Sequence, residues 1–293
     1  MDKHFAISTD SSCDLNKSYL AKHDVYCVVM KHILKGEEVA EHFDNDKQFD
    51  GFYEAIKTGS LPTTVAVNPI EAKAHFEKII ETEKSGDVIH MPLSSGLSAT
   101  CDNCVEAANI LNKDLKDRQV FVIDGMTASV GYGMLIDELI RLRDSGATTD
   151  EAIKRVKEMR DNTQSWFYVD DLSYMKRGGR ISGFKATLGT LLKIKPIILA
   201  NSKGKLAVEN RVKGTKAAVQ YVIDKMHKHG KGLPTYLWYT TKSDYYHELK
   251  SALKTHYPDM KITEGRVGPV IGSHVGGGSA MVVFEGDPRL DID

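Results

Sequence analysis

The serine-rich segment at residues 93–100 has the composition of an anion-binding loop. It reads Leu-Ser-Ser-Gly-Leu-Ser-Ala-Thr and follows a short apolar run. Three serine hydroxyls and the backbone N–H groups around Gly96 would be exposed together where a strand gives way to a helix. The segment lacks the Gly-x-Ser-x-Gly spacing of a hydrolase nucleophile and the Gly-Lys-Ser/Thr of a phosphate-binding P-loop. A helix cap beside a glycine explains the same residues equally well.

Charged residues and glycines gather in residues 170–181. This stretch contains two aspartates, three cationic side chains and the pair Gly178-Gly179. A glycine pair lets the backbone approach another group closely, and Arg180, which follows it, can grip an oxyanion through two parallel hydrogen bonds. The alternative interpretation is a solvated loop.

Three further segments carry weaker signals. His274 stands among five glycines near the C-terminus, where an imidazole could bond a carboxylate or phosphate, although a lone histidine is more often structural. Thr63 and Thr64 could donate to an anion, but alone they predict only a turn before a helix. Residues 10–14, Asp-Ser-Ser-Cys-Asp, favour a helix N-cap over a phosphatase nucleophile, which requires an Asp-x-Asp arrangement.

The cysteines and histidines show no metal-binding pattern. Cys101 and Cys104 have Cys-x-x-Cys spacing, but no second cysteine pair exists and the motif falls within a predicted helix. The eleven histidines are scattered, and none belongs to a His-Glu-x-x-His array. We therefore expect neither a redox pair nor a metal or other cofactor.

Strands and helices alternate through the first half of the chain. Short, β-branched apolar runs predict strands buried on both faces. These runs are Phe5–Thr9, Val25–Ile33, Val88–Leu93 and Val120–Asp124. Apolar residues at helical spacing predict helices at Ala72–Lys84, Asn103–Lys113 and Thr127–Asp144. This alternation is typical of an α/β fold in which a mostly parallel sheet lies between two helical layers.

The second half predicts a mixed sheet with helices. Strands are expected at Trp166–Val169, Ile194–Leu199, Leu206–Val212, Thr235–Thr240 and near Ala280–Glu285. The second and third of these flank an Asn-Ser-Lys-Gly turn and should form an antiparallel hairpin. Helices are expected after Thr148 and at Gly214–Lys228 and Ser243–His256. A boundary near residue 160 gives two α/β domains, residues 1–160 and 161–293.

Composition excludes several classes of protein. The 293 residues carry 39 Lys+Arg and 40 Asp+Glu, so the net charge of -1 offers no overall attraction to nucleic acid or an anionic membrane. No apolar run approaches the ~20 residues of a membrane-spanning helix, and the N-terminus lacks the apolar core of a secretory signal. Four cysteines make no disulfide framework. We expect a reduced, cytoplasmic protein.

Ordered motifs along almost the whole chain resemble the DegV family of bacterial fatty-acid-binding proteins, the carrier subunits of fatty acid kinase. The motifs that carry the resemblance are Asp10–Asp14, Thr63-Thr64, Ser94–Ser98, Asp170–Ile181, Ile194–Ile197 and Gly268–His274. The resemblance implies two α/β domains with a long-chain fatty acid bound between them. It also implies a partner, a separate ATP-binding kinase subunit.

The resemblance assigns roles to individual residues. Thr64 and Ser95 would hold the carboxylate, with Thr63 and Ser94 as alternatives one position earlier. Gly96, whose backbone N–H follows Ser95, would also bind the ligand. Arg180 and His274 would lie beside the head group and would assist phosphoryl transfer where it occurs.

The sequence departs from the family pattern near these residues. Thr64 is followed by Val65-Ala66-Val67-Asn68, where the family usually reads Thr-Ser-Gln-Pro-Ser. Ala99 stands where the family commonly has glycine. These changes affect lipid selectivity and donor geometry more than the fold.

The leading hypothesis is a carrier that binds a fatty acid and presents its carboxylate to the kinase subunit for conversion to an acyl phosphate, without independent catalytic activity. Two alternatives remain. One is a stand-alone small-molecule phosphotransferase with a fold like that of dihydroxyacetone kinases. The other is a lipid sensor that performs no chemistry.

Overall fold

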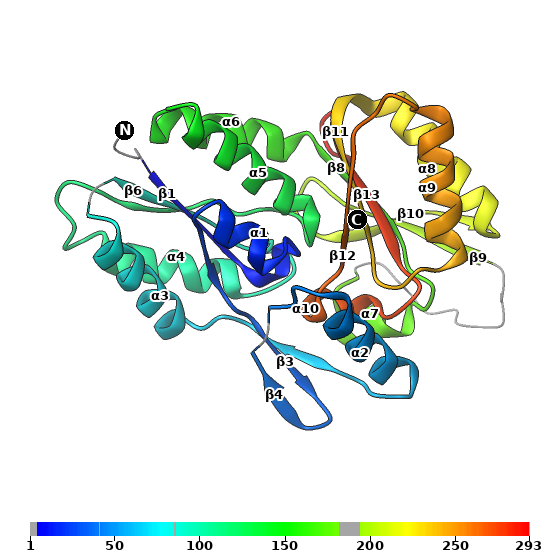
Figure 1. Ribbon diagram of the computed structural model, residues 1–293, viewed down its shortest axis with the longest axis horizontal. Helices are drawn as coiled ribbons and strands as arrows, with labels where there is room; N and C mark the ends of the chain where they lie inside the picture. The colour runs from blue at the N-terminus through cyan, green and yellow to red at the C-terminus, as the bar shows by residue number, and fades with distance from the viewer. Residues whose placement is uncertain (1–4, 41, 85, 182–193, 293) are drawn as a thin grey trace.

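Sheet A forms the centre of the first half of the protein in this computed structural model, which describes residues 5–40, 42–84, 86–181 and 194–292. Its four parallel strands lie in the order β2-β1-β6-β7 (Figure 1). They are β1 (Phe5–Asp10), β2 (Val25–Val28), β6 (Asp87–Met91) and β7 (Val120–Val122). The parallel sheet predicted from the apolar runs is confirmed.

Helices cover both faces of sheet A. On one face lie α3 (Pro69–Thr82) and α4 (Thr100–Leu111), and on the other α1 (Lys17–Lys22), α5 (Val130–Asp144) and α6 (Thr149–Asp161). The side chains of β1 alternate between the faces, since Phe5 and Ile7 pack in the α5 cluster and Ala6 in the α3 cluster. The three-layer arrangement is as the sequence predicts.

The predicted strand at Val25–Ile33 is wrong, because the chain there forms two strands in different sheets. After β2 it enters β3 (Lys31–Leu34), which pairs antiparallel with β4 (Glu37–Val39) and β5 (Thr63–Val65) in the small sheet B. Two short strands that follow each other share the β-branched composition of one long strand, and no glycine or proline marks the break. A strand, β5, also replaces the turn predicted around Thr63.

Sheet C organises the second half. Its six strands lie in the order β10-β9-β8-β13-β11-β12, antiparallel except for the last pair. They are β8 (Thr163–Tyr168), β9 (Ile194–Ala200), β10 (Leu206–Lys213), β11 (Gly230–Tyr239), β12 (Ile262–Arg266) and β13 (Ala280–Gly286). The hairpin of β9 and β10 and the mixed character of the sheet agree with the sequence predictions.

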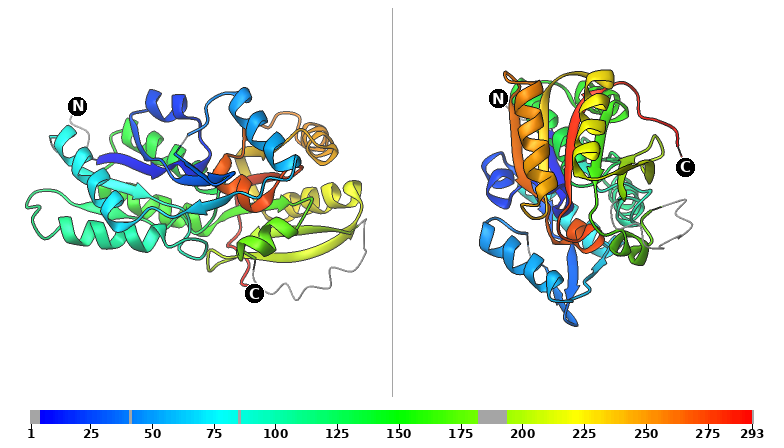
Figure 2. Two further views of the ribbon diagram at one scale, coloured as in Figure 1. Left: turned by 90° about the horizontal axis from the view of Figure 1, so that it is seen from below. Right: turned by 90° about the vertical axis from the view of Figure 1, so that its right-hand side faces the viewer.

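Helices α8 (Thr215–His229) and α9 (Asp244–His256) cover one face of sheet C, and α5 and α6 lie toward the other (Figures 1 and 2). Helix α5 contacts β1 of sheet A and also β8, β11 and β13 of sheet C. Its buried side chains therefore join the two halves in one apolar cluster. Every strand of sheets A and B precedes residue 123, and every strand of sheet C follows residue 162. The division into two domains at residue 160 stays a prediction.

Short helices occur where the sequence predicts loops. They are α7 (Ser173–Gly178) and α10 (Pro269–Val275). The helix N-cap predicted at residues 10–14 is confirmed, because the Asp10 side chain accepts from the Ser12 N–H and caps the 3-10 turn η1 (Ser11–Cys13). Helix α2 (Asp46–Lys57), which the sequence predictions omit, begins with a capping box between Asn45 and Gln48. Among the residues that the structure describes, no helix is both long and apolar enough to cross a membrane.

We expect the substitution Leu139→Ala to lower the free energy of unfolding by about 2–5 kcal/mol, because Leu139 of α5 is fully buried in the shared cluster. Chemical denaturation followed by circular dichroism and by tryptophan fluorescence measures the effect. Both tryptophans, Trp166 and Trp238, lie in sheet C, so a common core predicts that the two signals shift together.

The matched control is Arg141→Ala on the exposed side of the same helix, which should change stability by about 0.5 kcal/mol or less. A tryptophan transition that stays in place while the circular dichroism transition shifts would show that the halves unfold independently.

Candidate functional site

An outer cavity of about 160 Å³ lies where β5, α7, α10 and the loop after β6 meet. Among the described residues, four polar side chains line it, and they are Thr64, Ser98, Arg180 and His274. The remaining lining is apolar and includes Leu97, Met175, Leu206 and Ile271. A small group of hydrogen-bonding side chains therefore faces an otherwise apolar space, as is typical of a site for a ligand with one polar end.

His274 and Thr64 form a hydrogen-bonded pair at this cavity. The His274 Nε2 atom lies 2.9 Å from Thr64 Oγ1, and His274 Nδ1 has no partner among the described residues. Burial, with the charges of Arg180 and Arg177, lowers the pKa of His274 to about 4. The imidazole is therefore neutral near pH 7, and only one of its two nitrogens carries a proton.

Helix α10 is held in place from two directions. The backbone N–H of Gly268, its N-cap, donates to Asp14 Oδ1 at 2.8 Å, and the Tyr53 hydroxyl of α2 donates to the carbonyl of Val267 at 2.7 Å. Burial raises the pKa of Asp14 to about 8, although Gly268 and Ser129 donate to its carboxyl group. These contacts fix the helix that carries the His274 imidazole.

The glycine pair after α7 has two separate structural roles. A Cβ atom at Gly178 would overlap His274 Nδ1, so only glycine lets the α7 backbone come this close to the imidazole. Gly179 ends the helix in the left-handed region, with φ of 68°. The close approach expected from the sequence is confirmed, and the group approached is the His274 ring.

Arg180 lies exposed at the edge of the outer cavity. Its Nε donates to the carbonyl of Leu97 at 3.2 Å, and its Nη1 donates to the carbonyl of Gly178. A guanidinium group has five N–H donors. Within the described ranges these two bonds leave further donors for an anion at the cavity.

The serine loop is bonded mainly to the protein itself. The Ser94 hydroxyl donates to the carbonyl of Gly204 at 2.8 Å, and the exposed Ser95 hydroxyl donates to Asp124 Oδ2 at 2.5 Å. Each backbone N–H from residue 94 to residue 98 also has an acceptor in the protein. Between residues 94 and 98 the structure therefore leaves free none of the backbone N–H groups that the anion-binding interpretation requires.

Gly96 serves the packing of this loop. A Cβ atom there would lie 2.9 Å from the carbonyl oxygen of Gly204, in the turn between β9 and β10. The structure thus brings Thr64, Arg180 and His274 together at one cavity and gives Ser94, Ser95 and Gly96 other neighbours. A ligand role for these three residues stays a prediction.

Ser98 is a cavity residue that the sequence predictions did not select. Its hydroxyl lies 3.0 Å from Thr100 Oγ1 and accepts from the Thr100 N–H at 3.2 Å. The serine-rich composition indicated a polar loop at this place. Which of its serines faces the cavity depends on the turn from residue 94 to residue 98, which composition does not specify.

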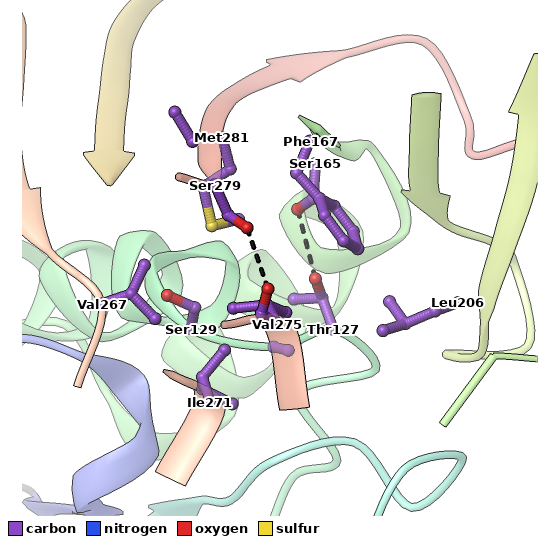
Figure 3. A pocket seen from close by; sticks show the side chains of 12 residues that line it. Thr127, Ser129, Ser165, Phe167, Leu206, Val267, Ile271, Val275, Ser279 and Met281 are labelled. Carbon is purple, nitrogen blue, oxygen red and sulfur yellow. Dashed lines mark hydrogen bonds between the residues drawn. The ribbon is translucent and has the colours of Figure 1, made fainter. Parts of the chain in front are cut away.

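An inner cavity of about 40 Å³, drawn in Figure 3, adjoins the outer one through lining residues that both cavities share. The two cavities share Ala128, Leu206, Ile271 and Val275 as lining residues. The inner cavity is bounded by apolar side chains such as Phe167, Val267 and Met281, together with four hydroxyl-bearing residues. Polar groups at the outer cavity are therefore followed by a mainly apolar interior.

The inner and outer cavities are both smaller in volume than typical ligand pockets, which measure ~300–1,000 Å³. A long apolar ligand would require the shared side chains to move apart. Ile271 and Val275 belong to the short helix α10 and Leu206 begins β10, so small shifts of these two elements would widen both cavities.

Comparison with known proteins decides the family. A family model for uncharacterised proteins of the DegV family matches residues 4–287. The chain belongs to the DegV family. A DegV domain-containing protein of Clostridium perfringens is 29% identical over 98% of this chain and 99% of its own length. Another DegV domain-containing protein, from Caldanaerobacter subterraneus, is 30% identical over 96% of this chain and 98% of its own length.

Solved DegV structures share the fold. The crystal structure of DegV from Bacillus subtilis, described as a fatty acid binding protein, has a TM-score of 0.82 at 25% identity and covers 97% of this chain and 100% of that chain. A DegV lipid binding protein from Thermotoga maritima has a TM-score of 0.81 at 25% identity, with 97% and 99% covered. The DegV resemblance and the α/β fold predicted from the motifs are thus confirmed.

We expect the substitution Arg180→Gln to raise the pKa of His274 above about 4, because it removes a positive charge that disfavours the imidazolium. Nitrogen-15 NMR of the histidine rings over a pH series measures this value. Since the folded-state pKa lies below the ~6.5 of an unfolded histidine, the folded state binds fewer protons in this range. The contribution of His274 to the free energy of unfolding should therefore fall as the pH drops from about 6.5 toward 4, and less steeply in the variant.

Arg141→Gln removes a distant cation from α5 and should leave His274 unchanged. An identical His274 titration in Arg180→Gln and the unsubstituted protein would show that the guanidinium does not act on the imidazole.

Proposed function

We propose that this DegV-family protein binds a long-chain fatty acid, with the carboxylate in the outer cavity and the acyl chain in the apolar interior. The observation that carries the proposal is the convergence of Thr64, Arg180 and His274 on a cavity whose remaining described lining, apart from Ser98, is apolar. The fatty acid and lipid binding described for the Bacillus subtilis and Thermotoga maritima relatives supports it.

The carboxylate would find both donors and charge at this place. With the proton of His274 on Nε2, the imidazole donates to Thr64 Oγ1, and the threonine hydroxyl proton is then directed to the ligand. The free N–H groups of Arg180 add a cationic donor. These donors matter because a buried carboxylate without partners is strongly unfavourable.

The acyl chain would supply most of the affinity. A C16 chain has about 14 methylene groups, and burial of each is worth ~0.8 kcal/mol, or about 11 kcal/mol before ordering costs. Part of this energy would be used to separate the side chains that now close the interior. The head group fixes the orientation of the ligand and the tail fixes its affinity.

The proposal extends to a carrier role. A carboxylate oxygen of the bound fatty acid would attack the γ-phosphorus of ATP held by a separate kinase subunit, with ADP as the leaving group and an acyl phosphate as the product. The exposure of Arg180 supports this role, because a partner could reach a head group beside it. Arg180 and His274 would then stabilise the added phosphate charge.

Protein purified from cells should contain about one fatty acid per chain, released on denaturation and measured by mass spectrometry. Thr64→Val keeps the shape of the side chain and removes its hydroxyl, so the affinity for the fatty acid should fall about tenfold. A fluorescent fatty acid displacement assay measures the change. The additional substitution Ser95→Ala tests whether that serine leaves Asp124 to bind the ligand.

Thr255→Val on α9 is the matched control, since Thr255 is exposed and donates to the carbonyl of Ser251. An absence of bound acyl chain, together with equal affinities in the Thr64→Val and Thr255→Val proteins, would remove the proposed site.

The loaded protein, mixed with ATP and an ATP-binding fatty acid kinase subunit, should yield an acyl phosphate that hydroxylamine traps as a hydroxamate. The isolated chain should give none, and Arg180→Gln should lower the yield because it removes charge stabilisation. Turnover of ATP by the isolated chain would instead identify a stand-alone phosphotransferase. Lipid binding without acyl phosphate in the mixture would identify a sensor.

A further inference from the structure

Two buried hydroxyl groups form a pair at the wall of the inner cavity. Thr127, in the segment before α5, and Ser165 of β8 are 1% and 2% exposed. Their oxygens lie 3.2 Å apart, and both side chains line the cavity (Figure 3). The pair is therefore separate from the polar group around His274 in the outer cavity.

The pair has one donor more than its own bond can use. Two hydroxyl groups carry two protons, and the single hydrogen bond between them occupies one. In the described part of the chain, neither oxygen has another hydrogen-bond partner. One buried O–H group therefore lacks an acceptor, which is unfavourable unless a further group enters the cavity.

The other hydroxyl groups of the same cavity differ in this respect. Ser279 donates to the carbonyl of Val275 at 3.1 Å, and Ser129 donates to Asp14. Their protons are thus already used within the protein. The unused donor belongs to Thr127 and Ser165.

Gly131 of α5 makes room for this pair. A Cβ atom there would lie 2.6 Å from Thr127 Oγ1 and 2.8 Å from Ser165 Oγ. Glycine within a helix is unfavourable compared with alanine. A purely apolar cavity wall could be built from alanine and valine, so the position of the glycine and the two hydroxyls together indicate a polar function.

We propose that Thr127 and Ser165 form a second polar subsite, which binds an oxygen atom carried on the acyl chain. The inference rests on the proposed fatty acid binding and specifies the substrate class as hydroxy or oxo fatty acids. Hydroxyl and ketone oxygens both accept the unused proton. A second carboxylate does not fit, because no cationic side chain lines the described inner cavity.

Water in the cavity would not remove this preference. A space of about 40 Å³ can hold a water molecule that accepts from the pair. A ligand oxygen that displaces this water replaces its hydrogen bond, whereas a methylene group leaves the donor without a partner. An acyl chain that carries an oxygen atom is therefore favoured over an unsubstituted chain, whether or not the cavity holds water.

The test compares stearate with stearates that carry one hydroxyl or one keto group at successive carbons along the chain, by displacement of a fluorescent fatty acid. We expect at least one position to bind roughly five- to tenfold more tightly than stearate, with a similar gain for the ketone. Thr127→Val combined with Ser165→Ala should abolish this gain while stearate binding persists. Ser279→Ala, in the same cavity, should leave the ratio unchanged.

The outcomes separate this inference from the proposed function. If stearate binds and no oxygenated chain binds more tightly, the second subsite is refuted and fatty acid binding stands. If no acyl chain binds, both are refuted. A gain that persists in the Thr127→Val/Ser165→Ala protein also overturns the subsite, and thermal melting of that variant shows whether it is folded.

Discussion

The close approach of the Gly178 backbone to the His274 imidazole is the contact on which the site depends. It brings together helices α7 and α10, which lie almost a hundred residues apart in the chain. Once they touch, the turn at Gly179 directs Arg180 to Leu97, and the imidazole meets Thr64 on β5. A larger residue at position 178 would separate the Arg180 guanidinium from the His274 imidazole, even if both of these side chains were kept.

The same contact governs the electrostatics of the cavity. A histidine buried beside two arginines stays neutral, so it acts as a hydrogen-bonding group and Arg180 supplies the charge. This division of roles between the neutral imidazole and the charged guanidinium suits a carboxylate, which needs a counter-charge but also a fixed orientation. The apolar lining behind these groups then determines what the rest of a ligand must be.

Sequence patterns predicted the fold where periodicity is strong, as in β1, the β9–β10 hairpin and α5. They failed at α2, α7 and α10, which are short or lie in charged and glycine-rich surroundings. The motifs also led to Thr64, Arg180 and His274. The partners of Ser94 and Ser95 could not be predicted, because Gly204 and Asp124 are distant in sequence and meet them only in the folded chain.

Residues from both halves of the chain line the outer cavity, with Thr64 and Leu97 before residue 123 and Arg180, Leu206 and His274 after residue 162. A molecule bound there would hold the halves together and add its binding energy to the stability of the folded state. Occupied and empty forms would then differ in lifetime, since proteases act on the fraction of chains that opens. The amount of the protein in a cell would thus follow the supply of its ligand.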